Sequence, residues 1–195
     1  MIINGIEQQP SKAELRRTLL KQRQSMPVRE WQEKSDRICS HLQSSPLFTR
    51  AQTILAYFSF RQEPDLSPLF TDTKRRWGFP RIENKSLVWH SWQPGESLQT
   101  GAYGILEPHP DCPTLQPNEV DLILVPAVGC DVQRYRLGYG GGFYDRLLSS
   151  DEWASKPTIG IVFEFAYLPQ LPVDPWDKPL HSICTEQRCQ VIGTP

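Results

Sequence analysis

The chain opens with a stretch in which apolar and charged positions recur with the period of an α-helix. Leu15, Leu19 and Leu20 form the apolar stripe. Ser11 is followed three residues later by Glu14, which is the spacing of a capping box. In that motif each side chain satisfies a free backbone N–H of the other residue. The pattern therefore predicts a first helix that begins directly after Ser11.

A second helix is predicted to open at Pro27, because proline is tolerated in the first turn of a helix. Trp31, Ile38 and Leu42 are spaced to form its buried face. Pro46 lies beyond its expected end.

Continuous apolar runs follow, and each is short enough to be a buried strand. Residues 53–60 predict a central strand, and residues 121–126 and 158–163 predict two more. Strands of this kind are typical of parallel sheets whose two faces are both covered. Residues 76–82 and 86–92 predict a hairpin with a short turn between them.

The order of these elements favours one fold class. Helices and continuous apolar strands alternate in the second half, which predicts a three-layer α/β/α fold with a mostly parallel central sheet. Residues 94–118 are rich in Pro and Gly and predict a long irregular excursion. At 195 residues we expect a single domain, preceded by an N-terminal extension over residues 1–10.

Composition limits the classes of partner and compartment. The net charge of -1 argues against general nucleic-acid binding and favours a small anion bound at one site. The 5 cysteines contain no CxxC pair, which predicts free thiols in a reducing compartment. No window reaches the roughly 18 apolar residues of a membrane span. No signal peptide is visible at the N-terminus, so we expect a cytoplasmic protein.

The glycine-rich segment at residues 138–142 carries the strongest chemical signal. Glycines lose much conformational entropy on ordering, so a simple turn does not need so many. A backbone that wraps an anion does need them, because side chains would block its N–H groups. Arg136 can add donors to phosphate oxygens, and Asp145 can hold Mg²⁺ against the same phosphates. The alternative is a flexible surface loop closed by an Arg136–Asp145 salt bridge.

The glycine segment does not match the common nucleotide-binding fingerprints. It lacks the GK[ST] ending of a P-loop. Phe143 occupies the last glycine position of a GxGxxG motif, which argues against a dinucleotide fold.

The segment does resemble the R-x-G-x-G-x-G-[FY]-Y-D signature of the 5-formyltetrahydrofolate cyclo-ligase family at every fixed position. Further matches follow in the expected order, at residues 12–16, 59–63, 103–108, 121–127 and 172–177. The resemblance covers nearly the whole chain, from Lys12 to Cys184. It implies a fold similar to CoA transferases and ribose-phosphate isomerases. It also implies a monomer that uses ATP and Mg²⁺ to close 5-formyltetrahydrofolate to 5,10-methenyltetrahydrofolate.

The resemblance also implies roles for particular residues. Lys12 and Arg136 are expected to act in catalysis by stabilising the charge of the transferred phosphate. Mg²⁺ is expected on Asp145 and Asp177. Folate contacts are expected from Phe58, Glu63, Tyr139, Gly140, Gly141, Gly142 and Phe143. ATP contacts are expected from Lys12, Arg16, Arg136, Leu137, Gly138, Tyr139, Gly140, Gly141, Gly142, Phe143 and Tyr144.

Each of these roles has a plainer alternative. Lys12 and Arg16 share one helix face and can meet one triphosphate, or they can form a solvated basic face. Glu63 can hold folate, or it can cap a helix opened by Pro64. Asp177 can be an ordinary turn residue. The aromatic residues can belong to the core, and the histidines have no ligand-like spacing. They are His41, His90, His109 and His181, of which His181 follows Asp177 most closely.

Two rival functions remain open from the sequence. The first is a sugar-phosphate isomerase or a CoA-transferase-like enzyme on a similar scaffold, which would not consume ATP. The second is a folate- or nucleotide-binding protein without catalysis. The co-occurrence of Lys12, Arg16, Arg136, Asp145 and Asp177 argues against a pure binding protein, which has less need of a metal–phosphate centre.

Overall fold

The computed structural model describes residues 9–190. Its first helix, α1 (Lys12–Gln24), begins after Ser11, whose side chain accepts from the backbone N–H of Glu14. The Glu14 carboxylate in turn accepts from the backbone N–H of Ser11, so the predicted capping box is confirmed. Of the predicted N-terminal extension, residues 1–8 lie outside the described residues.

The second helix, α2 (Val28–Gln43), starts one residue after Pro27, which is its N-cap. Ile38 and Leu42 are fully buried, as their spacing predicts, and Trp31 packs against the same core from a partly buried position. Pro46 does more than follow this helix, because it opens the short helix α3 (Pro46–Arg50).

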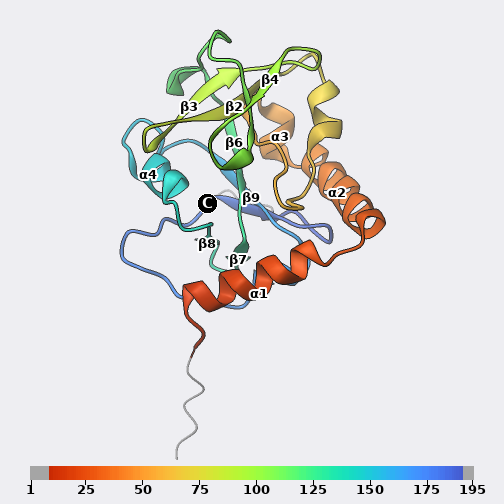
Figure 1. Cartoon of the computed structure of the whole chain (residues 1–195), viewed down its shortest axis with the longest axis vertical. Helices are drawn as coiled ribbons and strands as arrows, with labels where there is room; N and C mark the ends of the chain where they lie inside the picture. The colour runs from red at the N-terminus through yellow and green to blue at the C-terminus, as the bar shows by residue number, and fades with distance from the viewer. Residues whose placement is uncertain (1–8, 191–195) are drawn as a thin grey trace, which may run out of the picture.

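The predicted mostly parallel central sheet is present (Figure 1), with six strands in the order β11-β9-β6-β1-β2-β3. Every neighbouring pair is parallel except β2 and β3, which form the predicted hairpin. The strands are β1 (Thr53–Leu55), β2 (Arg76–Glu83), β3 (Ser86–Ser91), β6 (Leu122–Pro126), β9 (Thr158–Ile161) and β11 (Ser182–Cys184).

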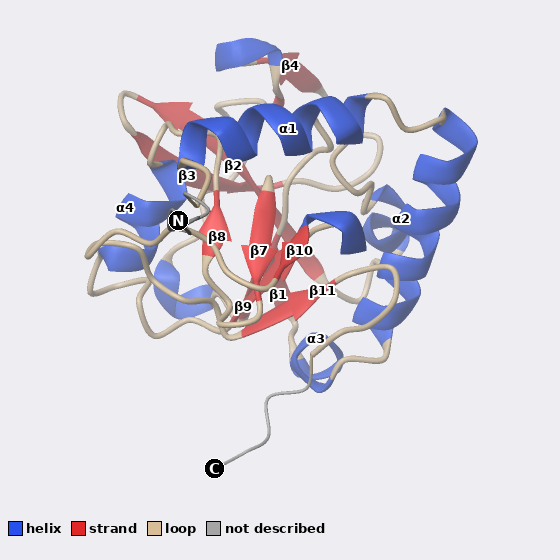
Figure 2. Cartoon of the chain, turned by 90° about the horizontal axis from the view of Figure 1, so that it is seen from below, coloured by secondary structure: helices blue, strands red, loops and turns tan. Residues whose placement is uncertain are grey.

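Both faces of this sheet are covered by helices. Successive side chains of a strand point to opposite faces, so Leu122 and Leu124 enter one core cluster while Ile123 and Val125 enter the other. The first cluster includes side chains of α2 and α3, and the second includes Leu19 of α1 and side chains of α4 (Phe143–Ser149). Figure 2 shows α2 and α4 on opposite sides of the molecule. The three-layer prediction is confirmed.

The predicted strand at residues 53–60 is too long, because β1 ends at Leu55. Ala56 still donates to the carbonyl of Gly78, but the chain then turns away from the sheet. Arg61 and Gln62 both have positive φ, at 49° and 55° respectively. The apolar residues after Leu55 therefore pack into the core and line a cavity instead of extending the strand.

The segment at residues 94–118, which the sequence predicts to be irregular, contains regular structure. β4 (Leu98–Thr100) and β5 (Leu106–Pro108) form an antiparallel pair around the 3-10 turn η2 (Ala102–Gly104). A small sheet also separates β6 from the glycine loop. It consists of β7 (Gly129–Asp131), β8 (Arg136–Leu137) and β10 (Tyr167–Leu168).

Helix α1 runs beside this small sheet (Figure 1), where Leu19 packs close to Gly129 of β7. All 5 cysteines are free thiols. Among residues 9–190, no helix combines the length and apolar character that a membrane crossing requires.

Candidate active site

A cavity of about 530 Å³ brings together every residue that the sequence analysis assigned to ATP, folate or metal. Its walls come from α1, the segment after β1, the β2–β3 hairpin, the β4–β5 pair, the glycine loop and the Pro-rich segment before β11. The assigned residues on its lining are Lys12, Arg16, Phe58, Glu63, Arg136, Leu137, Gly138, Tyr139, Gly140, Gly141, Gly142, Phe143, Tyr144, Asp145 and Asp177.

The glycine loop presents bare backbone to this cavity. Within the described chain, the N–H groups of residues 138–142 donate no hydrogen bond to protein atoms. Gly140 has φ of +101°, a conformation that L side chains rarely adopt. A Cβ on Gly138 would lie 2.5 Å from Nη1 of Arg136. Gly140 is therefore required for the shape of the loop, whereas the contact at Gly138 is with the movable end of a side chain. The shape of the loop leaves its N–H donors available to an anion.

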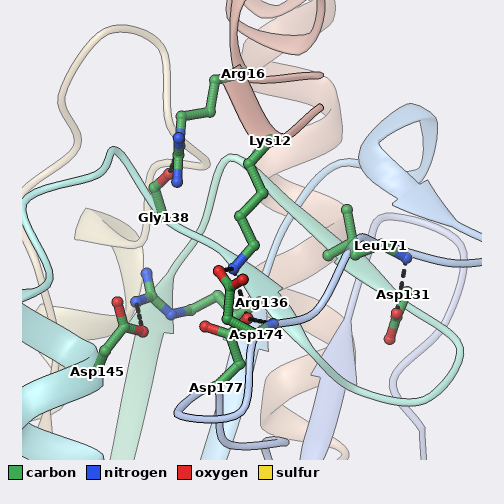
Figure 3. A network of polar contacts seen from close by, with 9 residues as sticks. All are labelled: Lys12, Arg16, Asp131, Arg136, Gly138, Asp145, Leu171, Asp174 and Asp177. Atoms are coloured by element: carbon green, nitrogen blue, oxygen red, sulfur yellow. Dashed lines mark hydrogen bonds and ion pairs between the residues drawn. The ribbon is translucent and has the colours of Figure 1, made fainter. Parts of the chain in front are cut away.

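Lys12 and Arg16 descend from one face of α1 toward the loop, as Figure 3 shows. The Lys12 ammonium lies 2.6 Å from Oδ2 of Asp174 and 2.5 Å from Oδ2 of Asp177. Burial acts to lower the pKa of Lys12, but hydrogen bonds to the two carboxylates outweigh it and raise that pKa above 10.5. Arg16 donates from Nε to the carbonyl of Gly138 at 2.7 Å. The helix face is thus engaged with the cavity and is not a solvated basic surface.

Arg136 and Asp145 form the salt bridge that the sequence allows, with Nη2 and Oδ1 2.9 Å apart (Figure 3). The Arg136 guanidinium also lies 5.2 Å from the centre of the Tyr144 ring. The plainer interpretation of this pair as the closure of a surface loop is incomplete, because both residues line the cavity. The ion pair and the cavity coexist.

Glu63 lies at a different part of the cavity and is only 3% exposed. Its carboxylate accepts from the Tyr139 hydroxyl at 3.0 Å and from the backbone N–H of Phe60 at 3.1 Å. Burial raises the pKa of Glu63 to about 7, against the opposing effect of Arg23. The alternative role as a helix cap is wrong, because Pro64 opens no helix and the next element is the 3-10 turn η1 (Ser67–Thr71).

Apolar and aromatic side chains form the walls around Glu63. Phe58 stacks on the core residue Phe79 with ring centres 4.1 Å apart, so it belongs to both the core and the cavity wall. Tyr103 is 72% exposed and lies edge-to-face with Phe143 at 6.4 Å. The Tyr144 hydroxyl is buried and, among the described residues, has no hydrogen-bond partner. A flat ligand with polar edges suits these walls.

Comparison with known proteins agrees with this arrangement. A model of the 5-formyltetrahydrofolate cyclo-ligase family matches residues 8–186. The chain belongs to the 5-formyltetrahydrofolate cyclo-ligase family. It is 32% identical to 5-formyltetrahydrofolate cyclo-ligase of Mycolicibacterium smegmatis, over 91% of this chain and 95% of that protein. It is 28% identical to 5-formyltetrahydrofolate cyclo-ligase of Escherichia coli strain K12, over 85% of this chain and 95% of that protein.

A solved structure is similar over nearly the full length. The NMR structure of Aquifex aeolicus 5,10-methenyltetrahydrofolate synthetase has a TM-score of 0.83 and 31% identity, and the match covers 94% of this chain and 95% of that one. The fold and the family expected from the glycine signature are therefore confirmed.

Within this cyclo-ligase cavity, some lining residues were missed by the sequence analysis. Asp174 lies three residues before Asp177 and shares its lysine, so the spacing within the Pro-rich segment was an available signal. Trp176 lines the cavity between them, although it is 62% exposed. His181, in contrast, lies outside the cavity lining and bonds Thr158, which indicates a structural role.

Arg23 was missed as well. It stands eleven residues after Lys12, which is close to three helical turns and places both on one face of α1. The spacing of Lys12, Arg16 and Arg23 was therefore a readable pattern of three cations on one face. Arg23 differs from Lys12 and Arg16 in its position, because it is 3% exposed and lies outside the cavity lining.

Proposed function

We propose that this chain uses ATP and Mg²⁺ to convert 5-formyltetrahydrofolate to 5,10-methenyltetrahydrofolate, with release of ADP and phosphate. One observation carries the proposal: a single cavity joins a loop of free backbone donors and three cations to an apolar chamber with a buried carboxyl group. Family membership and the names of the relatives support the same reaction.

The phosphate end is formed by the amides of residues 138–142 together with Lys12, Arg16 and Arg136. Free N–H groups in a glycine loop are suited to phosphate oxygens. Lys12 and Arg136 are neutralised by carboxylates before ATP arrives. We expect the incoming phosphates to compete with these carboxylates for the cations, since charge-assisted bonds to phosphate are of similar strength.

Carboxylates that phosphate displaces from Lys12 and Arg136 become available to bind Mg²⁺. The described residues contain no group of three or more His, Cys, Asp or Glu side chains that could form a protein metal cage. Mg²⁺ in phosphate sites needs only one or two carboxylates, with water and phosphate completing its shell. Asp145 and Asp177, with Asp174 beside it, fit that requirement on the cavity wall. When bound, Mg²⁺ would reduce the negative charge of the transferring phosphate group.

The folate end is formed by Glu63 and the aromatic walls. A pterin ring presents N–H donors on its edge and flat faces above and below. The Glu63 carboxylate and the buried Tyr144 hydroxyl supply the polar contacts, and Phe58, Tyr139 and Phe143 supply the faces. Burying N–H groups without such acceptors would cost free energy, which makes the carboxylate a selective feature.

The chemistry requires activation of an amide-like oxygen, which is a poor leaving group. The formyl oxygen attacks the γ-phosphorus of ATP, the bond to ADP breaks, and an iminium phosphate forms. The 10-nitrogen then attacks the formyl carbon and loses its proton to solvent, and the C–O bond breaks as phosphate leaves. The task of the chain is to align the two substrates and to stabilise the phosphate charge, with Lys12, Arg136 and the loop amides closest to it.

We expect the enzyme to act in the cytoplasm as a monomer. The 5 free thiols suit a reducing compartment. Neither the compartment nor the monomeric state is needed for the chemistry above.

The test is to mix the chain with Mg·ATP and 5-formyltetrahydrofolate and to follow the near-ultraviolet absorbance of the methenyl product together with ADP. We expect both to appear in equal amounts, and neither to appear when either substrate is omitted. Folate binding without ADP release would favour a binding protein, and turnover of a sugar phosphate without ATP would favour an isomerase. Either outcome would refute the proposal.

A further inference from the structure

The last turn of α1 holds a buried cation that the proposed reaction does not use. Arg23 is 3% exposed, and among residues 9–190 it makes no direct ion pair. A buried guanidinium is costly unless its donors are satisfied. Its partners are the carbonyl of Arg61 at 3.0 Å, the carbonyl of Ala127 at 3.4 Å and the Tyr139 hydroxyl.

These three partners come from three segments that meet at the cavity. Arg61 belongs to the turn after β1, Ala127 follows β6, and Tyr139 belongs to the glycine loop. The Arg23 guanidinium also lies 5.5 Å from the centre of the Tyr139 ring. One side chain therefore fixes the position of Tyr139 relative to two other walls.

The turn to which Arg23 donates a hydrogen bond, at Arg61 and Gln62, has an unfavourable backbone conformation. Arg61 and Gln62 have φ of 49° and 55°, a region that residues with a side chain seldom occupy. Gln62 donates to the carbonyl of Met26 just beyond α1, at 3.3 Å. The end of α1 thus stabilises the strained turn at Arg61 and Gln62. Glu63 directly follows this turn and lines the cavity.

Arg23 also reaches Glu63 electrostatically. The Tyr139 hydroxyl contacts the guanidinium and donates to Oε1 of Glu63 at 3.0 Å, so it bridges the two charges. The hydrogen bond from Tyr139 also favours the ionised form of Glu63. Burial and the Glu63 charge raise the pKa of the Tyr57, Tyr139 and Tyr144 phenols, so these groups are neutral. Arg23 is therefore the cation that favours the ionised carboxylate.

We infer that Arg23 is a positioning residue that sets both the orientation and the charge of Glu63 through Tyr139, and so determines the pH range in which folate binds. The inference rests on the proposed function in one respect, namely that Glu63 contacts the folate. It assigns to Arg23 a task separate from the ATP contacts of Lys12 and Arg16 on the same helix.

The experiment compares R23M with R17M by calorimetric titration of 5-formyltetrahydrofolate across pH 5.5 to 9. Arg17 is a matched control, because it is an exposed arginine on the same helix outside the cavity lining. In R23M we expect the acid limb of the affinity profile to move to higher pH by about one unit or more, which weakens binding about ten-fold near neutral pH. R17M should stay within about two-fold of wild type. R23K keeps the positive charge, so the acid limb of its affinity profile should stay near the wild-type position. Its affinity for folate should fall, because lysine lacks the planar set of guanidinium donors that orients Tyr139.

A purely structural role for Arg23 gives a different result. Then R23M lowers the melting temperature but leaves the acid limb where wild type has it, and that outcome overturns the inference. The double variant R23M/E63Q should bind no more weakly than E63Q alone, and an additive loss also contradicts the inference. If wild type itself fails to bind 5-formyltetrahydrofolate, the proposed function fails instead.

Discussion

The buried Glu63 carboxyl group is predicted to make the fold less stable as pH rises. Its pKa is about 7 in the folded protein, against 4.5 for an ordinary solvated glutamate. Between these two values the folded state binds more protons than the unfolded state, so the free energy of unfolding falls as pH increases. The contribution is complete below the unfolded pKa and is lost as pH rises through the folded pKa.

The size of this effect follows from the shift. At 1.36 kcal/mol for each pKa unit, the shift from 4.5 to about 7 corresponds to about 3 kcal/mol at alkaline pH. Replacing Glu63 with Gln removes the titration. Tyr139 and Phe60 donate to different oxygens of Glu63, so the single amide oxygen of Gln keeps one of these hydrogen bonds, and the loss of the other lowers stability equally at every pH. The stability of E63Q relative to wild type should therefore grow by about 2–3 kcal/mol between pH 5 and pH 8.

Urea unfolding of both proteins at several pH values measures this difference. A matched control is E33Q, because Glu33 is an exposed residue of α2. We expect E63Q to gain stability with pH relative to wild type while losing most folate-dependent turnover, and E33Q to change neither. A constant difference between E63Q and wild type across this pH range would refute the argument, because it would mean that Glu63 does not titrate abnormally.

Two further substitutions test the phosphate end. D145N should abolish ATP-dependent methenyl formation with an unchanged circular dichroism spectrum, because the carboxylate expected to hold Mg²⁺ is lost; near-normal turnover would refute that metal role. G140A should destabilise the loop by about 1–2 kcal/mol, since Gly140 has φ of +101°. Initial rates should then show a KM for ATP raised about ten-fold, whereas an unchanged KM would mean that the loop does not contact ATP.

The sequence predicts the regular parts of this fold well, because local signals and tertiary packing agree there. The capping box at Ser11 and Glu14 and the apolar run of β6 both form the elements that their patterns predict. The run at residues 53–60 fails as a full strand for a physical reason. Apolar residues are equally suited to a sheet and to a cavity wall, and only the left-handed turn at Arg61 and Gln62 separates these uses.

The candidate site was predictable where its chemistry lies in one segment. The glycine loop and its flanking Arg136 and Asp145 are contiguous, so their pattern is visible in the sequence. Contacts between distant segments are not visible in this way. Lys12 meets Asp174 across 162 positions, and Tyr139 meets Glu63 across 76. These pairings depend on the order of the strands, which no local pattern specifies.

In the proposed reaction, ATP activates the formyl oxygen of the folate by phosphorylation. The most direct measurement uses 5-formyltetrahydrofolate labelled with oxygen-18 in the formyl group, followed by mass spectrometry of the phosphate released. We expect one labelled oxygen in each inorganic phosphate. Label found in water, with unlabelled phosphate, would contradict it.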